Sequence, residues 1–80
     1  MTITAEISYY PLADNYTGII DRFIDEISVE GITVEVGKMS TLLIGEYDKI
    51  MSILTHSMKT VMVDFPSVFT LKISNSCPVD

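Results

Sequence analysis

The stretch "GITVEVGKMSTLLIGE", residues 31–46, decides the fold because it predicts two strands in succession. Between Ile32 and Val36, apolar side chains alternate with polar ones, which is the pattern of a strand with one buried face. The dipeptide Gly37-Lys38 suits a hairpin turn, and a second strand follows it. In this second strand we assign Leu42 and Ile44 to one face and Thr41, Leu43 and Gly45 to the other.

A helix and then a strand are predicted on each side of this hairpin. Residues 14–27 and 46–62 carry apolar stripes at helical spacing, and Pro66 ends the second helical pattern. Residues 2–10 and 67–74 alternate as strands do. In the second helix the predicted inward stripe consists of Tyr47, Ile50, Met51, Leu54, Met58 and Val61.

The resulting order is β-α-β-β-α-β. In a chain of 80 residues this order predicts a single α+β domain, residues 1–80, with a ferredoxin-like βαββαβ fold. Right-handed crossovers place both helices on one face of a four-stranded antiparallel sheet. We expect the helices to cover Ile3, Ala5, Ile7, Ile44, Leu71 and Ile73. We expect the helix-free face to carry Glu6, Ser8, Tyr10, Thr41, Leu43, Gly45, Thr70, Lys72 and Ser74.

This helix-free face mixes hydroxyls, an acid, a base and an aromatic ring, and two interpretations fit it. A partner could cover the face, with Glu6 and Lys72 paired across strands. Alternatively, the face holds a small molecule, with hydroxyls fixing a ring and Glu6 holding a protonated nitrogen. The periodicity alone favours the first interpretation.

The amino-acid composition and the net charge limit the kinds of partner that the protein is expected to bind. The chain is 48% hydrophobic, with a mean hydropathy of +0.37. A chain this short buries only roughly 60–65% of its unfolded surface, so we expect a homodimer or a dimer of dimers. A net charge of −6 argues against nucleic acid and anionic membranes, and it is compatible with a cationic small ligand.

The chemistry-bearing residues are few. A single cysteine, Cys77, excludes a disulfide framework and a cysteine-rich zinc site, and no acidic cluster predicts another metal. His56 is expected on the surface of the second helix, and no nucleophile–base pair is visible, so we expect neither an enzyme nor a cofactor. Without a signal peptide or a membrane-length apolar run, the expected location is cytoplasmic.

Three segments carry a resemblance to a known family: "ITAEISYYPLADNY", "KMSTLLIGEYDKI" and "KISNSCPVD". They resemble the YkoF-like family, which binds thiamine and hydroxymethylpyrimidine. The matching positions are Ser8, Tyr10 and Pro11, then Ser40, Thr41 and Gly45, and finally Ser74, Cys77, Pro78 and Asp80. Some relatives hold two such domains in tandem, so the resemblance implies that a homodimer takes the place of the pair.

The resemblance implies a non-enzymatic binder of thiamine or its hydroxymethylpyrimidine moiety, acting in thiamine salvage or transport. The candidate ligand-binding residues are Glu6, Ser8, Tyr10, Ser40, Thr41, Leu43, Ser74 and Cys77. Tyr10 and Leu43 would contact the ring faces, and the hydroxyls would bind the ring edge. Glu6 is included because of its charge, since the family pattern does not require an acid at this position. Cys77 is expected to line the wall of the pocket. A ligand-free or regulatory homo-oligomeric interaction module remains the alternative.

Overall fold

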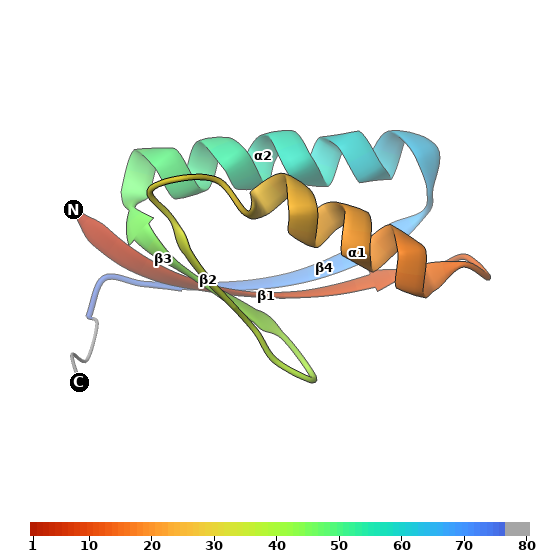
Figure 1. The fold of residues 1–80 in the computed structure, drawn as a ribbon, viewed down its shortest axis with the longest axis horizontal. Coiled ribbons are helices and arrows are strands. Elements are labelled where there is room, and N and C mark those ends of the chain that lie inside the picture. Colours follow the sequence, from red (N-terminus) through yellow and green to blue (C-terminus); the bar gives the residue numbers. More distant parts are fainter. Residues whose placement is uncertain (77–80) are drawn as a thin grey trace.

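A computed structural model of the chain describes residues 1–76 and confirms the ferredoxin-like α+β fold. The four strands form one antiparallel sheet in the order β2-β3-β1-β4, and both helices cover the same face of it (Figure 1). The elements are β1 (Thr2–Pro11), α1 (Tyr16–Ile27), β2 (Thr33–Val36), β3 (Thr41–Glu46), α2 (Tyr47–Asp64) and β4 (Ser67–Ser74).

Helix α1 forms because its apolar residues share one face. Ile19, Phe23 and Ile27, each four residues apart, are buried against the sheet. Asn15 occupies the N-cap position, although its side chain makes no capping hydrogen bond. Beyond the helix, Gly31 adopts a φ of +92°, which a side chain would disfavour, and the Lys49 ammonium packs where its Cβ would lie.

Helix α2 begins directly after β3 because Glu46 caps it. The Glu46 carboxylate accepts a hydrogen bond of 2.8 Å from the backbone N–H of Asp48. That bond is the main reason why the pKa of Glu46 lies below its ordinary value, and the nearby N-terminal ammonium of Met1 lowers it further.

The buried face of α2 differs in part from the predicted stripe. Ile50, Leu54 and Val61 are buried as expected, whereas Tyr47 is exposed and Met58 is only partly buried. Ser57 is buried instead, and its hydroxyl has no hydrogen-bond partner among the described residues. His56 is exposed, as predicted. Among the described residues, no helix combines the length and hydropathy that a membrane span requires.

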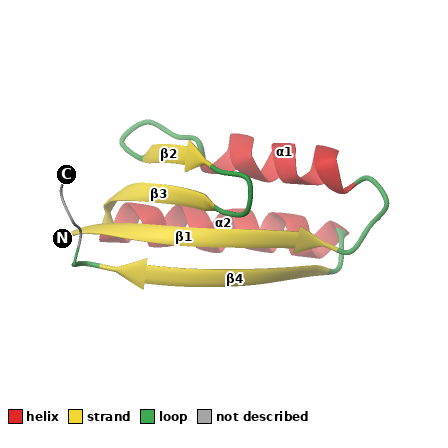
Figure 2. Ribbon diagram, turned by 90° about the horizontal axis from the view of Figure 1, so that it is seen from below, coloured by secondary structure: helices red, strands yellow, loops and turns green. Residues whose placement is uncertain are grey.

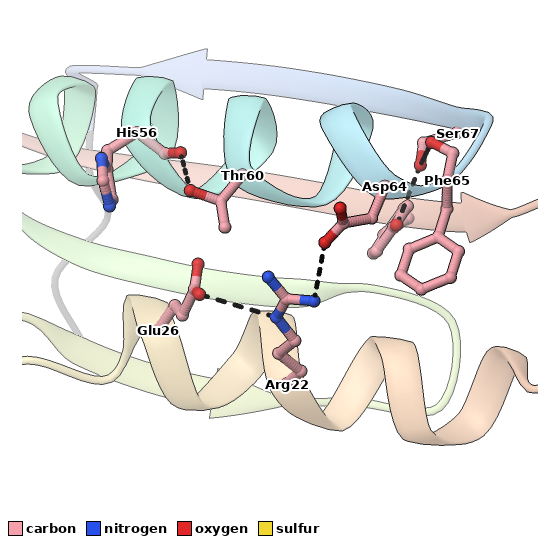
Figure 3. A network of polar contacts seen from close by, with 8 residues as sticks. Arg22, Glu26, His56, Thr60, Asp64, Phe65 and Ser67 are labelled. Carbon is pink, nitrogen blue, oxygen red and sulfur yellow. Dashed lines mark hydrogen bonds and ion pairs between the residues drawn. The ribbon is translucent and has the colours of Figure 1, made fainter.

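The core lies between the helices and the sheet. Aromatic rings fill one end, where Tyr9 stacks on Phe69 with their centroids 4.3 Å apart and Phe23 tilts against both rings. At the rim, Arg22 of α1 lies 3.2 Å from Asp64 of α2 and 3.8 Å from Glu26 (Figure 3). Such exposed ion pairs contribute at most about 1 kcal/mol each, so burial is the main source of stability.

The predicted facing of β3 is wrong. In the sheet Leu43 pairs with Ala5 and Thr41 pairs with Ile7, so both residues lie under the helices and both are buried. Gly45 shares that face, and the helix-free face carries Leu42 and Ile44 instead. The sequence misleads here because β3 has large apolar residues on both faces, so alternation alone does not distinguish them.

Candidate functional site

The helix-free face is organised around Glu6 in the middle of β1. Glu6 pairs with Leu42 of β3 on one side and with Lys72 of β4 on the other, and Leu42 pairs in turn with Glu35 of β2. Residues paired across antiparallel strands share a face and stand about 5 Å apart. Two carboxylates and one ammonium therefore lie in a single row across the sheet.

Glu6 is held by two polar contacts. The Ser40 hydroxyl donates a hydrogen bond of 2.8 Å to one carboxylate oxygen, and the Lys72 ammonium lies 3.9 Å from the other. The predicted cross-strand pair of Glu6 and Lys72 is thus confirmed. The Glu6 side chain remains 41% exposed, so a ligand can still reach its carboxylate.

Glu35 adds a second carboxylate to this neighbourhood. Its side chain forms neither an ion pair nor a hydrogen bond with another residue in the part of the chain that the structure describes. A pocket of about 230 Å³ opens here, which we call the sheet-face pocket, and its lining residues are Glu6, Glu35, Val36, Gly37, Ser40 and Leu42. With two carboxylates in its wall, the sheet-face pocket favours a cation.

A second pocket lies on the other side of the same turn, between α1 and the sheet. We call it the helix-side pocket; its volume is about 100 Å³. Its walls are mostly apolar or aromatic, and Ser40 and Thr41 bring hydroxyls to them. The lining residues are Ile7, Tyr9, Ile20, Phe23, Ile24 and residues 36–41. Such a lining suits part of a flat ring.

Two hydrogen bonds hold the turn between the two pockets in place. The backbone N–H of Gly37 donates to the carbonyl of Ser40 at 2.9 Å, which confirms the predicted hairpin. The Ser8 hydroxyl donates to the carbonyl of Met39 at 3.2 Å and ties the turn to β1. Residues 36, 37 and 40 line both pockets, so one short segment sets the shape of each.

The structure brings together three of the eight predicted ligand-binding residues on the helix-free face. Glu6 and Ser40 line the sheet-face pocket, and Ser8 supports the turn beside it. Thr41 also lies at this turn, but on the helix side, where it lines the helix-side pocket rather than the predicted open face. Leu43 was predicted to contact a ring and is instead part of the core.

The other predicted residues lie elsewhere. Tyr10 pairs with Val68 near the far end of β1, and Ser74 pairs with Thr4 near the opposite end of the sheet. Neither residue lines one of the two pockets. Cys77 lies outside the described residues, together with Pro78 and Asp80.

The sequence analysis missed Glu35 as a site residue. Its alternation with Val34 and Val36 correctly placed it on the polar face of its strand. The alternation does not show which residue of the neighbouring strand lies opposite Glu35, because that depends on how β2 pairs with β3. The pairing of Glu35 with Leu42, next to Glu6, is visible only in the assembled sheet.

Solved structures share this fold closely. A protein from Thermotoga maritima, provisionally assigned to thiamine biosynthesis or salvage, is 26% identical, with a TM-score of 0.83 over 95% of this chain and 85% of its own. A hypothetical protein from Methanocaldococcus jannaschii is 26% identical, with a TM-score of 0.84 over 99% of this chain and 84% of its own. A domain of unknown function from Bacillus cereus is 23% identical, with a TM-score of 0.81 over 100% of this chain and 83% of its own, and this similarity supports the fold alone.

Among curated proteins, none matches the chain significantly. The sequence profile of one family does match it, and that family is described as thiamine-binding protein. The match runs over residues 5–75, from the first strand to the end of the last, and therefore includes both pockets and the turn between them. The chain thus belongs to the thiamine-binding protein family.

Proposed function

We propose that the protein binds thiamine or its hydroxymethylpyrimidine moiety without converting it, and that it serves thiamine salvage or transport. The observation that carries this proposal is the pair of pockets on either side of residues 36–41, one acidic and one largely apolar. Thiamine has the matching parts, because it joins a flat aminopyrimidine ring to a positively charged thiazolium ring. Family membership supports the same ligand class.

Glu6 and Glu35 are the residues we assign to the ligand's positive charge or its amino group. Lys72 neutralises only part of the charge of Glu6, because its ammonium is 3.9 Å away and largely exposed. A charge-assisted hydrogen bond contributes roughly 1.5–3 kcal/mol. Removing one carboxylate should therefore weaken binding by about one to two orders of magnitude.

Calorimetric titration with thiamine and with hydroxymethylpyrimidine tests this assignment. Glu6→Gln and Glu35→Gln remove the two carboxylates, and Glu30→Gln is the matched control because it makes the same charge change at an exposed residue that lines neither pocket. We expect the first two variants to bind thiamine more weakly and the control to bind as wild type does. Equal weakening in all three variants would attribute the effect to net charge and overturn the assignment.

Thr41→Val tests the helix-side pocket separately. Valine keeps the shape and removes the hydroxyl, so a folded variant with weaker binding of hydroxymethylpyrimidine supports ring recognition there. Binding indistinguishable from wild type would exclude that hydroxyl from the site.

The binding experiment also decides between the two candidate functions. Absence of saturable binding of either compound at millimolar concentration would refute the proposal and favour the ligand-free interaction module. Recovery of unaltered ligand after long incubation, checked by mass spectrometry, is expected for a non-enzymatic binder. A product that forms only with the protein present would contradict that part.

A further inference from the structure

A further pocket lies in the helical layer, between the segment that follows α1 and the first half of α2. Its volume is about 420 Å³, and we call it the helical-layer pocket. It shares no lining residue with the sheet-face pocket or the helix-side pocket. Figure 2 views the helix-free face, and both helices lie behind the sheet, so the helical-layer pocket is separate from the sheet-face pocket. The lining residues are Val29, Lys49, Ser52, Ile53 and His56.

Helix α2 brings three hydrogen-bond donors to this pocket. Lys49, Ser52 and His56 occupy positions i, i+3 and i+7, which lie on one face of a helix over two turns. An ammonium carries three donors, and a hydroxyl and an imidazole each carry at least one. Val29 and Ile53 supply the apolar part of the wall. The pocket therefore combines several donors with a small apolar surface.

These donor side chains are available to a ligand. In the part of the chain that the structure describes, the side chains of Lys49, Ser52 and His56 form neither an ion pair nor a hydrogen bond with another residue. All three residues are exposed. An incoming ligand therefore does not have to displace an internal partner in order to reach them.

The position of Lys49 is restricted by the turn that follows α1. Its ammonium packs against Gly31, in the space that a Cβ at this position would occupy. Because the side chain already has a packing contact, less of its conformational freedom is left to lose when a ligand binds. Gly31 thus keeps the positive charge of Lys49 next to the pocket.

The carboxylates of this region lie outside the pocket wall. Glu46 accepts a hydrogen bond from the backbone N–H of Asp48, and Glu26 lies 3.8 Å from Arg22 (Figure 3). Asp48 and Glu30 each adjoin a lining residue in sequence, but neither lines the pocket. The wall therefore carries positive charge in a protein whose net charge is −6, and it favours an anion.

The set of donors fits a phosphate monoester better than a carboxylate. A phosphate monoester has three terminal oxygens and nearly two negative charges at neutral pH, which matches three donor side chains. A carboxylate offers only two oxygens and one charge. Lysine is also a common ligand of phosphate groups in proteins. The volume of the pocket leaves room for an organic group beside the phosphate, and Val29 and Ile53 suit a small apolar one.

We propose that the helical-layer pocket binds a small phosphate monoester. Lys49, Ser52 and His56 contact the phosphate oxygens, and Val29 and Ile53 contact the organic part. The proposal concerns a second site and does not depend on the binding of thiamine.

Nuclear magnetic resonance of the ¹⁵N-labelled protein tests this site, with phenyl phosphate as the probe. In buffer of physiological ionic strength we expect saturable shifts of the amides of residues 29, 49, 52, 53 and 56, with those of residues 36–41 unchanged. Lys49→Gln and His56→Ala should each raise the dissociation constant by about fivefold or more, because each removes a donor to a charged group. Lys59→Gln is the matched control, since it makes the same charge change as Lys49→Gln at an exposed residue of α2 that does not line the pocket.

Four results would overturn the proposal. They are the absence of saturable shifts at millimolar phenyl phosphate, shifts centred on residues 36–41, equal weakening by Lys49→Gln and Lys59→Gln, and binding of benzoate as tight as that of phenyl phosphate. Circular dichroism checks that each variant is folded. Because Lys49 packs against Gly31, a destabilised Lys49→Gln would leave the decision to His56→Ala and Ser52→Ala, which change exposed residues. Binding unchanged in both of these variants would then overturn the assignment.

Discussion

Replacing Ser57 with alanine should stabilise the protein. Ser57 is fully buried in α2, and its hydroxyl has no hydrogen-bond partner among the described residues. A buried, unsatisfied polar group costs about 1–3 kcal/mol. Alanine also has a higher helix propensity than serine, by roughly 0.5 kcal/mol. The oxygen that is lost leaves only a small void, so we expect Ser57→Ala to raise the free energy of unfolding by about 1–2 kcal/mol.

Urea denaturation followed by circular dichroism measures this change. In thermal unfolding, an increase of that size should raise the melting temperature by about 4–16 °C in a domain of this length. Ser52→Ala is the control, because Ser52 is an exposed residue of the same helix and reports helix propensity alone. If Ser57→Ala is no more stable than Ser52→Ala, the hydroxyl is satisfied in the folded protein, and the reasoning is wrong.

Three further predictions use the same measurements. Leu43→Ala should lower the free energy of unfolding by about 2–5 kcal/mol, and Leu42→Ala by clearly less; the reverse order would contradict the facing of β3. The pKa of Glu46 is lowered in the folded protein, so the stability that its ionised carboxylate contributes is present at neutral pH and is lost as the pH falls through that pKa. Glu46→Gln should therefore make the free energy of unfolding depend less on pH on the acid side, and an unchanged dependence would refute this. Gly31→Ala should destabilise the protein by about 1–2 kcal/mol because Gly31 has a positive φ and the Lys49 side chain packs against it, whereas unchanged stability would mean that the turn relaxes freely.

The order of the elements could be predicted from the sequence because its signals are local. Alternation in residues 2–10 and 67–74, helical stripes and the turn at Gly37-Lys38 each act over a few residues, and together they allow few arrangements. The facing of β3 could not be predicted in this way. Its residues 41–45 are apolar enough on both faces that only the pairing with β1 settles which side meets the helices.

The candidate site shows the same division between local and long-range information. Glu6 and Ser40 were both identified from the sequence, and their hydrogen bond connects β1 to the start of β3. Glu35 was not identified, because its position beside them depends on the pairing of two further strands. The burial of Ser57 in place of Met58 is also long-range, since it depends on how α2 rotates against the sheet.

The corrected position of Thr41 sharpens the ligand hypothesis. Had Thr41 shared the helix-free face with Glu6, substitutions at both residues would have probed one site. Instead, Thr41 lines the helix-side pocket and Glu6 the sheet-face pocket, with residues 36–40 between them. Thiamine, which has a flat ring and a separate charge, should therefore bind more weakly after either substitution. Hydroxymethylpyrimidine lacks the thiazolium, so its binding should depend less on the carboxylates if these contact the thiazolium, and equally if they contact the amino group. Comparing the two ligands across the same variants thus distinguishes recognition of the ring from recognition of the charge.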